Sequence, residues 1–363
     1  MSSIDPSSAV SGAGLSILFL EKVFLGPCRS EARGVELFNF NLLRDLVRLG
    51  RSVTVVAHPD WHAILKNRLG ADAPEVLTFP AWMMGALGAA WALYRARRRR
   101  FSILLTANVG DRLVPALSVV RRYRLAPRAV LLAHREPTPR FVGAQGLMPT
   151  TVVAVNRKIA RGFEGLRYGR VEVYYGITQA ERFLQPRPEK AEEAPVDFCV
   201  VGDLNSAWKG ADTAVEAFRL LAPEVAARCR LNLASFREER TGHDPRILCY
   251  QWMPFEEMAA FIRRMDVMLV PSRDETVMRE TFSQAAVQGM LSGLPLIVSD
   301  LSILTEKVDE GGGLVAHSAE EMAAAMTRLA NDPVLRARMG EQARITAKAR
   351  YIWSTEEFLK RFA

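Results

Sequence analysis

Residues 266–300 read DVMLVPSRDETVMRETFSQAAVQGMLSGLPLIVSD, and this stretch decides the class of fold. Residues 266–272 form an apolar, β-branched run that is typical of a buried strand. A polar loop follows, and a helix is predicted from about Glu280 to Leu291. The turn Gly293-Leu294-Pro295 then leads into a second apolar run. A strand, a helix and a strand in this order predict a parallel sheet with helices packed on its faces.

The same alternation of short apolar runs with helical patterns continues along the whole chain. The runs in the first half are 16–20, 52–58, 76–79, 102–108, 129–134 and 171–176. Those in the second half are 197–204, 231–236, 247–253, 267–272, 294–300 and 313–316. Two such series predict an α/β protein with two doubly wound, Rossmann-like domains. Ligands bind sheets of this kind beyond the carboxyl ends of the strands, so the residues there are the candidates for function.

Length and proline content predict how the domains are divided. A chain of 363 residues suggests two domains. Residues 185–196 contain three prolines and a run of charges, which is typical of a linker. We therefore expect a flexible tail over 1–14, an N-terminal domain over 15–184, a linker over 185–196 and a C-terminal domain over 197–345. Residues 346–363 are expected to form a closing helix that packs back on the N-terminal domain.

Composition excludes several classes of protein. Hydrophobic residues make up 49% of the chain and charged residues 24%, a balance that rules out collagen-like and wholly disordered chains. No window of about 18 residues is apolar throughout, so no membrane span is predicted. Residues 1–14 lack the features of a secretory leader. The four cysteines lie far apart without a CxxC pair, which argues against a zinc site or a disulfide framework and favours the reducing cytoplasm.

Charge is distributed unevenly between the two halves. Residues 1–185 contain 26 lysines and arginines against 13 acidic residues, whereas residues 186–363 contain 22 against 27. The basic half is expected to face an anionic partner. Within it, residues 79–94 are apolar with two tryptophans, and an arginine cluster follows up to residue 100. This pattern is typical of a helix lying on an anionic membrane surface; the alternative is a buried helix that ends in a solvated charge run.

Several motifs of the second half occur together. Counting back from the Gly-Leu-Pro turn at 293–295 gives an acidic residue, Glu280, and then Gln288, two turns later on nearly one helix face. Residues 200–218 read VVGDLNSAWKGADTAVEAF, a strand, a glycine turn and a Lys-Gly pair that opens a helix. With the glycine-rich tail over 311–345, these motifs resemble the retaining glycosyltransferases of family 4, of the glycosyltransferase group 1 type. That family has a second acidic residue where this chain has Gln288, and an arginine where it has Asp203.

The resemblance implies a GT-B fold, in which two Rossmann-like domains face each other across a cleft. It implies that residues 15–184 bind the acceptor and residues 197–345 the nucleotide-diphosphate sugar. The activity it implies is a hexosyltransferase-type transfer, with retention, to a glycan or lipid-linked acceptor. The expected setting is cell-surface polysaccharide or lipopolysaccharide synthesis, in the cytoplasm or peripherally on the inner face of the cytoplasmic membrane.

The candidate site residues of the second half lie at strand ends and near the predicted start of a helix. The resemblance assigns Lys209 to the donor diphosphate, where its charge would stabilise the leaving group. It places Glu280 on the sugar or the phosphates. It places Gln288 on the ribose hydroxyls, which an uncharged amide can still hydrogen-bond. Because a helix N-terminus favours anions, further donor contacts are expected there. They are the backbone N–H groups of Thr281, Phe282 and Ser283, and Gly202, in the glycine turn before Lys209, is a further donor-binding candidate.

The first half supplies fewer candidates. His134 ends a predicted strand, and the resemblance places a histidine there near the reacting sugar, where a neutral imidazole could hydrogen-bond a hydroxyl of the donor. Arg33 and Gly34 follow the first strand and are expected near the phosphates, while Asn108 is an acceptor-side candidate. No D-x-D sequence occurs in the chain, so neither a bound metal nor a cofactor is expected.

Other functions stay open at this point. The same fold is compatible with a nucleotide-sugar epimerase or a phosphorylase. Asp203 and Gln288 also leave room for a non-catalytic protein that binds a nucleotide sugar or a glycan. Nucleic-acid binding is not expected, because the arginine clusters lack interleaved aromatic residues and the second half is acidic.

Overall fold

The structure is a computed structural model that describes residues 14–28, 34–83, 85–107, 110–145, 150–166, 168–191, 193–235, 244–251, 253–273 and 280–363. The chain forms two compact units. Unit 1 comprises Met1–Tyr175 and Ser354–Ala363, and unit 2 comprises Gly176–Trp353. The predicted tail over 1–14 lies outside the described residues except for Gly14.

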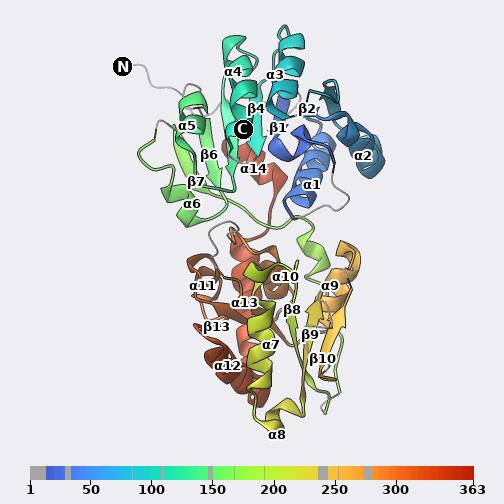
Figure 1. Cartoon of the computed structure of the whole chain (residues 1–363), viewed down its shortest axis with the longest axis vertical. Helices are drawn as coiled ribbons and strands as arrows, with labels where there is room; N and C mark the ends of the chain where they lie inside the picture. The colour runs from blue at the N-terminus through green and yellow to red at the C-terminus, as the bar shows by residue number, and fades with distance from the viewer. Residues whose placement is uncertain are drawn as a thin grey trace. The chain divides into compact units, whose positions relative to one another are not determined.

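Unit 1 is built on a parallel sheet in the order β3-β2-β1-β4-β5-β6-β7 (Figure 1). Its strands are β1 (Ser16–Glu21), β2 (Ser52–Ala57), β3 (Glu75–Thr78), β4 (Ile103–Ala107), β5 (Ala129–Ala133), β6 (Thr150–Ala154) and β7 (Arg170–Val173). Its helices are α1 (Gly34–Arg48), α2 (Pro59–Leu69), α3 (Gly85–Arg95), α4 (Val114–Arg122), α5 (Pro139–Gln145), α6 (Arg157–Arg161) and α14 (Thr355–Phe362). The strand order reverses between β1 and β4, and ligands bind such sheets at the carboxyl ends beside that switch point.

Burial explains why the central strands of unit 1 could be predicted. Every residue of β4 and β5 is buried, because helices cover both faces of the sheet. The strand β6 was not among the expected runs, although its Thr-Thr-Val-Val-Ala sequence is β-branched. It pairs in parallel with β5 on one side and β7 on the other.

The last helix of the chain belongs to unit 1. The hydroxyl of Tyr174 donates to the carbonyl of Ser354 over 3.1 Å, and the Thr355 hydroxyl lies 3.4 Å from Asp45 in α1. The ring of Phe362 packs 5.6 Å from that of Tyr174. Residues 346–353, which were expected to belong to the closing helix, instead lie in unit 2, where α13 runs from Pro333 to Arg350.

Unit 2 is built on a second parallel sheet, in the order β10-β9-β8-β11-β12-β13 (Figure 1). Its strands are β8 (Val196–Val200), β9 (Cys229–Ala234), β10 (Ile247–Tyr250), β11 (Val267–Val270), β12 (Leu296–Ser299) and β13 (Gly313–Ala316). Its helices are α7 (Ala211–Arg219), α8 (Pro223–Ala226), α9 (Phe255–Arg263), α10 (Gln284–Leu291), α11 (Ser302–Val308), α12 (Ala319–Asn331) and α13 (Pro333–Arg350). The order again reverses between two central strands, here β8 and β11.

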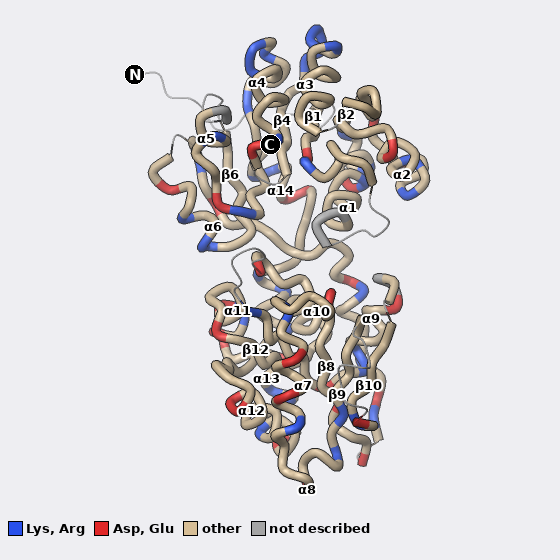
Figure 2. The backbone as a smooth tube through the Cα atoms, viewed as in Figure 1, with Lys and Arg blue, Asp and Glu red and all other residues tan. Residues whose placement is uncertain are grey.

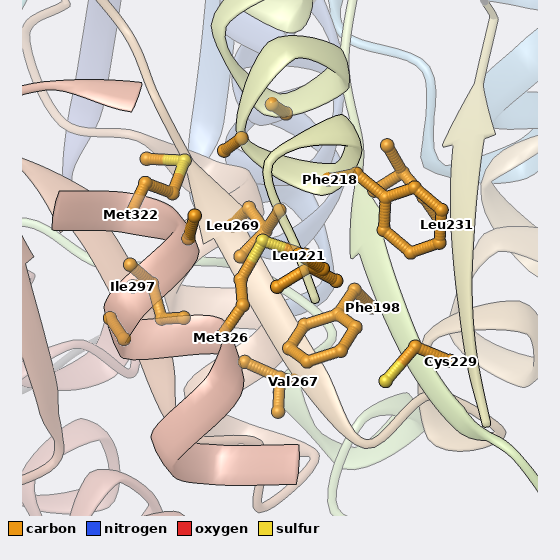
Figure 3. Close-up of a cluster of buried hydrophobic side chains, with 14 of the residues drawn as sticks. Phe198, Phe218, Leu221, Cys229, Leu231, Val267, Leu269, Ile297, Met322 and Met326 are labelled. Atoms are coloured by element: carbon orange, nitrogen blue, oxygen red, sulfur yellow. The ribbon is translucent and has the colours of Figure 1, made fainter. Parts of the chain in front are cut away.

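An apolar core fixes the helices of unit 2 on the sheet. Figure 3 shows Phe198 of β8, Phe218 of α7 and Met326 of α12 meeting in one cluster, and all three are fully buried. The side chains interdigitate between one sheet face and the helices α7 and α12, so the ends of β8 and β11 are held in place.

The proline-rich stretch over 185–196 does not separate the two units. Arg187 lies 3.1 Å from Asp266, and Lys190 lies 2.6 Å from both Asp266 and Asp197. Both acids are buried, so the two basic side chains neutralise carboxylates at the amino ends of β8 and β11. The stretch is therefore part of unit 2, and the division falls at 175/176 instead.

Candidate functional site

Lys209 is presented by a tight loop between β8 and α7. The loop ends in the 3-10 turn η5 (Ala207–Lys209), and Gly210 follows with a φ of +66°. A Cβ at Gly210 would lie 1.9 Å from the carbonyl oxygen of Pro271, so only glycine allows this approach. The backbone N–H of Arg273 also donates to the carbonyl of Trp208 over 2.7 Å. The loop is therefore fixed against the carboxyl end of β11.

Lys209 and Glu280 form an ion pair at this edge of the sheet. The Lys209 Nζ and the Glu280 Oε2 are 2.6 Å apart, and only 15% and 8% of their side chains are exposed. The sequence therefore correctly predicts that these two residues lie together in unit 2. A pair this sheltered from water is worth more than an exposed one, and losing either partner leaves a poorly solvated charge.

The Glu280 carboxylate connects three segments of the chain. Besides Lys209, its Oε2 accepts a hydrogen bond from the hydroxyl of Ser272 over 3.2 Å. Its Oε1 accepts from the backbone N–H of Ser283 over 3.2 Å. A carboxylate offers about four acceptor directions, so roughly one is left for a sugar hydroxyl. Glu280 thus organises the site before it can contact a ligand.

The helix near Glu280 begins later than predicted. α10 starts at Gln284, and its N-cap, Ser283, has the left-handed angles φ 57° and ψ 78°. The expected start at Glu280 is wrong because a bend over 281–283 intervenes before the helix. The N–H of Ser283 is already bonded to Glu280, so the N–H groups of the helix's first turn begin at Gln284. The side chain of Phe282, which lies in this bend, is buried and only 5% exposed.

A small pocket lies beside the ion pair. It is formed by the ends of β8 and β11 and by the start of α10, and it is lined by Val200, Val201, Lys209, Leu269, Val270, Pro271, Ser272, Ser283 and Ala285. The hydroxyl of Ser283 is buried here and has no hydrogen-bond partner among the described residues. Most of the lining is apolar, but the lysine, the two serine hydroxyls and the adjoining helix start could contact an anionic group at its rim.

Two neighbours hold the Lys209 side chain in its position. Its Nζ lies 4.3 Å from the ring centre of Trp208, a cation–π contact that favours the charged ammonium. At Gly202, which has a φ of +141°, an added Cβ would come 3.4 Å from the Lys209 Cε. That is an ordinary contact distance, so the positive φ of Gly202, and not a lack of space, is what favours glycine beside the lysine stem. Trp208 and Ser272 had been given no role from the sequence, although both adjoin predicted site elements.

Asp203 and Gln288, which depart from the family pattern, form no hydrogen bond with Lys209 or Glu280 among the described residues. Asp203 is exposed and accepts from the Ser206 hydroxyl over 2.9 Å. The Arg273 guanidinium donates to the Thr213 hydroxyl in α7 over 2.6 Å. Gln288 lies on the buried side of α10 and is 7% exposed. Its side-chain amide makes no hydrogen bond to the residues that the structure describes, so its donors and its acceptor are available to a ligand.

Lys307 is a buried cation that the sequence did not single out. It lies in α11, is 1% exposed, and its Nζ has no hydrogen-bond partner in the described part of the chain. The rings of Phe282 and Tyr351 face it, with centres 4.6 and 4.2 Å from the Nζ. Burial lowers the pKa of Lys307 to about 8, while Glu306 and Glu280 oppose that shift. Lys307 thus supports the Phe282 bend from inside unit 2.

His134 of unit 1 is a buried, neutral imidazole. It follows directly after β5, is 4% exposed, and packs edge-on against Tyr175 with ring centres 4.9 Å apart. Its Nε2 has no hydrogen-bond partner among the described residues. Burial, followed by the charges of Lys22 and Arg135, lowers the pKa of His134 to about 3. It is therefore uncharged near neutral pH and can serve only as a hydrogen-bonding group.

The remaining candidates of unit 1 are only partly described. Gly34 is the first residue of α1. Arg33 and Asn108 lie outside the described residues. In the region predicted to meet a membrane, α3 has a buried side that includes Leu93, while Trp82 and Leu87 are 81% and 69% exposed. The segment thus has both buried and exposed apolar residues, and the membrane-surface interpretation stays a prediction.

Two kinds of feature are absent from the residues that the structure describes: a membrane-spanning helix and a metal-binding cluster. None of the helices there is long and apolar enough to span a bilayer. Nor does that part of the chain contain a group of three or more His, Cys, Asp or Glu side chains that could hold a metal ion.

Comparison with known proteins agrees with the geometry of unit 2. Residues 195–332 match the model of the family described as Glycosyl transferases group 1. No curated protein sequence matches the chain. The matched region, residues 195–332, is thus similar to that family and includes the strand ends, the Lys209–Glu280 pair and α10. The prediction that the chain is a glycosyltransferase is confirmed at this level.

Solved structures extend the similarity to both units. HepE of Anabaena in complex with UDP is 16% identical, with a TM-score of 0.70, over 96% of this chain and 98% of that one. Sucrose-phosphate synthase of Thermosynechococcus elongatus is 15% identical, with a TM-score of 0.65, over 95% and 98%. WaaG, a glycosyltransferase involved in lipopolysaccharide biosynthesis, is 15% identical, with a TM-score of 0.59, over 94% and 98%. The predicted fold of two Rossmann-like domains of the GT-B type is confirmed.

Proposed function

We propose that the chain is a retaining glycosyltransferase of family 4 that moves a sugar from a nucleotide-sugar donor to a glycan or lipid-linked acceptor. The observation that carries the proposal is the 2.6 Å contact between Lys209 and Glu280 beside the pocket of unit 2. It lies within the region that matches the group 1 family, and at the sheet edge where such folds bind ligands. HepE has also been solved with UDP-glucose, which supports a donor of this class.

The chemistry proposed for unit 2 is stabilisation of a departing diphosphate. As the bond between the sugar and the phosphate breaks, negative charge grows on the phosphate oxygen. Lys209 lies in a sheltered site, where a fixed positive charge is worth more than in water. The first turn of α10 adds N–H groups with a favourable dipole. Glu280, bonded to Ser272 and Ser283, keeps the lysine in place and has about one acceptor direction left for a sugar hydroxyl.

No separate protein base is needed in this proposal. The acceptor hydroxyl attacks the sugar from the face that the phosphate leaves, and the departing phosphate oxygen takes the hydroxyl proton. His134, whose pKa is lowered to about 3, stays neutral and can accept or donate a hydrogen bond to a sugar hydroxyl. We further propose that the reaction needs neither a bound metal nor a cofactor.

The proposed acceptor is part of a cell-surface polysaccharide or lipopolysaccharide, reached from the cytoplasmic side of the membrane. Blue backbone segments, which mark lysines and arginines, lie at the ends of α3 and α4 in Figure 2. Arg97, just after α3, lies 4.4 Å over the ring of Tyr94, while Trp82, before α3, and Leu87, in its first turn, are exposed. Aromatic and aliphatic groups next to arginines suit an anionic bilayer surface. Cosedimentation with phosphatidylglycerol vesicles at low salt should be lost in Trp82→Ser/Leu87→Ser, whereas equal binding by the variant would oppose this arrangement.

Donor screening followed by product analysis tests the proposed activity. The purified chain is incubated with UDP-, GDP-, ADP- and TDP-sugars and a lipid or glycan acceptor extract, and products are separated by mass spectrometry. We expect a product with one added hexose and a released nucleoside diphosphate. Isomerised donor without transfer would indicate an epimerase, and a sugar phosphate formed with free phosphate would indicate a phosphorylase. Donor binding without any product would indicate a non-catalytic binding protein.

A further inference from the structure

Three basic side chains gather at the carboxyl ends of neighbouring strands in unit 1. Lys22 directly follows β1, Arg112 lies in the turn η3 (Asp111–Leu113) after β4, and Arg135 follows His134 after β5. β4 pairs in parallel with β1 on one side and with β5 on the other. The three loops therefore leave the same edge of the sheet, beside its switch point.

Two contacts show that these loops meet. The hydroxyl of Thr138, in the loop after β5, donates to the carboxylate of Asp111 in η3. A Cβ built on Gly110 would lie 3.8 Å from the Lys22 Cδ, so the lysine stem passes beside the backbone that leads into η3. We call Lys22, Arg112 and Arg135 the basic cluster.

The basic cluster combines a partly buried lysine, Lys22, with two exposed arginines, Arg112 and Arg135. Within the described ranges, none of its three members makes an ion pair with an acidic side chain. Burial lowers the pKa of Lys22, and the charges of Arg135 and Arg112 lower it further, with Glu21 opposing them. A half-buried ammonium beside two guanidinium groups is costly to maintain, because like charges repel and water is partly excluded.

Three acids adjoin the cluster, but none of them forms an ion pair with its members in the part of the chain that the structure describes. Asp111 receives the Thr138 hydroxyl, and Glu21 accepts the backbone N–H of Val23 over 3.1 Å. Glu136 is exposed. An anionic ligand would supply the negative charge that is not paired with these side chains. Two guanidinium groups and one ammonium can hydrogen-bond several oxygens of a phosphate.

We propose that the basic cluster binds a phosphate group carried by the acceptor. This inference rests on the proposed transferase function. It narrows the acceptor to a phosphorylated molecule, either a phosphosugar or a lipid-linked phosphate. Both sources share the same chemistry, a phosphate ester whose oxygens take charge-assisted hydrogen bonds.

Titration calorimetry on the full chain tests the proposal with two probes. Glucose 6-phosphate represents the soluble source, and dihexanoyl phosphatidylglycerol below its critical micelle concentration represents the lipid source. We expect the wild type to bind at least one of them, and Lys22→Met and Arg135→Gln each to weaken that binding about tenfold or more. The control Lys66→Met removes an exposed lysine of α2 and should leave binding unchanged.

Two further readouts separate this site from its rivals. Lys22→Met should melt at or above the wild-type temperature, because it removes a repelled and half-buried charge, so lost binding cannot be attributed to misfolding. Nucleoside diphosphate binding should be unchanged in Lys22→Met. The proposal is overturned if neither probe binds, if the variants bind as tightly as the wild type, or if nucleoside diphosphate binding falls in parallel. If a phosphate probe binds in a Lys22-dependent way but the chain transfers no sugar, the proposed transferase function is overturned and the phosphate site is not.

Discussion

Glu280 is the residue through which the candidate site of unit 2 is organised. Its two oxygens reach Lys209, Ser272 and the backbone of Ser283, which come from three different segments. Sequence reasoning could place Glu280 and Lys209 in one site, because each belongs to a motif with a fixed spacing. It could not assign the contact of Ser272 or the cation–π contact of Trp208. Those depend on how close two loops come in space, which spacing along the chain does not specify.

Substitution of Lys307 by methionine should stabilise the fold at neutral pH. The folded-state pKa of Lys307 is lowered to about 8, so below that pH the folded chain must keep a desolvated ammonium that the unfolded chain hydrates. We expect Lys307→Met to raise the free energy of unfolding by about 2 kcal/mol at pH 7, as measured by chemical denaturation. The contacts with Phe282 and Tyr351 offset part of the full cost.

The stability difference between the wild type and Lys307→Met should depend on pH. As pH rises from about 8 towards the unfolded-state pKa, the folded lysine loses its proton first, so wild-type stability rises and the advantage of the variant shrinks. The exposed Lys348→Met in α13 serves as control and should show no such dependence. A variant less stable than the wild type at pH 7 would mean that the ring contacts outweigh desolvation.

At the scale of elements, the site depends on the close approach of the β8–α7 loop to the end of β11. Gly210→Ala would force a Cβ to within 1.9 Å of the Pro271 oxygen, so the loop must move away and carry Lys209 with it. We expect a loss of stability of about 2–4 kcal/mol and a larger loss of donor binding, measured by denaturation and calorimetry.

A matched substitution separates backbone strain from the close approach. Gly293 has a similar φ of +75°, but an added Cβ there meets nothing within 4 Å. Gly293→Ala should therefore lose only about 1 kcal/mol and keep donor binding. Equal effects of the two substitutions would show that the contact with Pro271 does not determine the position of Lys209.

The elements also show where prediction from the sequence ends. Twelve runs of apolar residues located their strands because both faces of a parallel sheet are buried, but the Thr-rich β6 was missed because its polar side chains weaken that signal. The start of α10 was placed four residues too early. Glu280 is a plausible first-turn residue, yet its carboxylate bonds to the Ser283 N–H from outside the helix, and the left-handed Ser283 delays the helix to Gln284.

At the scale of the whole molecule, the two-unit α/β architecture followed from the repeated strand and helix patterns, whereas the division between the units did not. Prolines and charges at 185–196 are typical of a linker. Ion pairs of Arg187 and Lys190 with buried carboxylates nevertheless tie that stretch to unit 2. Composition indicates only that a segment could be exposed to solvent. Whether it packs against a domain depends on specific contacts such as these ion pairs.

The Lys209–Glu280 pair in unit 2 is proposed to bind the diphosphate of a sugar donor. The most direct test of this claim is calorimetric titration of UDP, GDP, ADP and TDP into the wild type, Lys209→Met and the control Lys348→Met. We predict that at least one nucleoside diphosphate binds the wild type and the control equally, and binds Lys209→Met at least about tenfold more weakly. Equal binding to the wild type and Lys209→Met, or no binding to any of the three proteins, would contradict the claim.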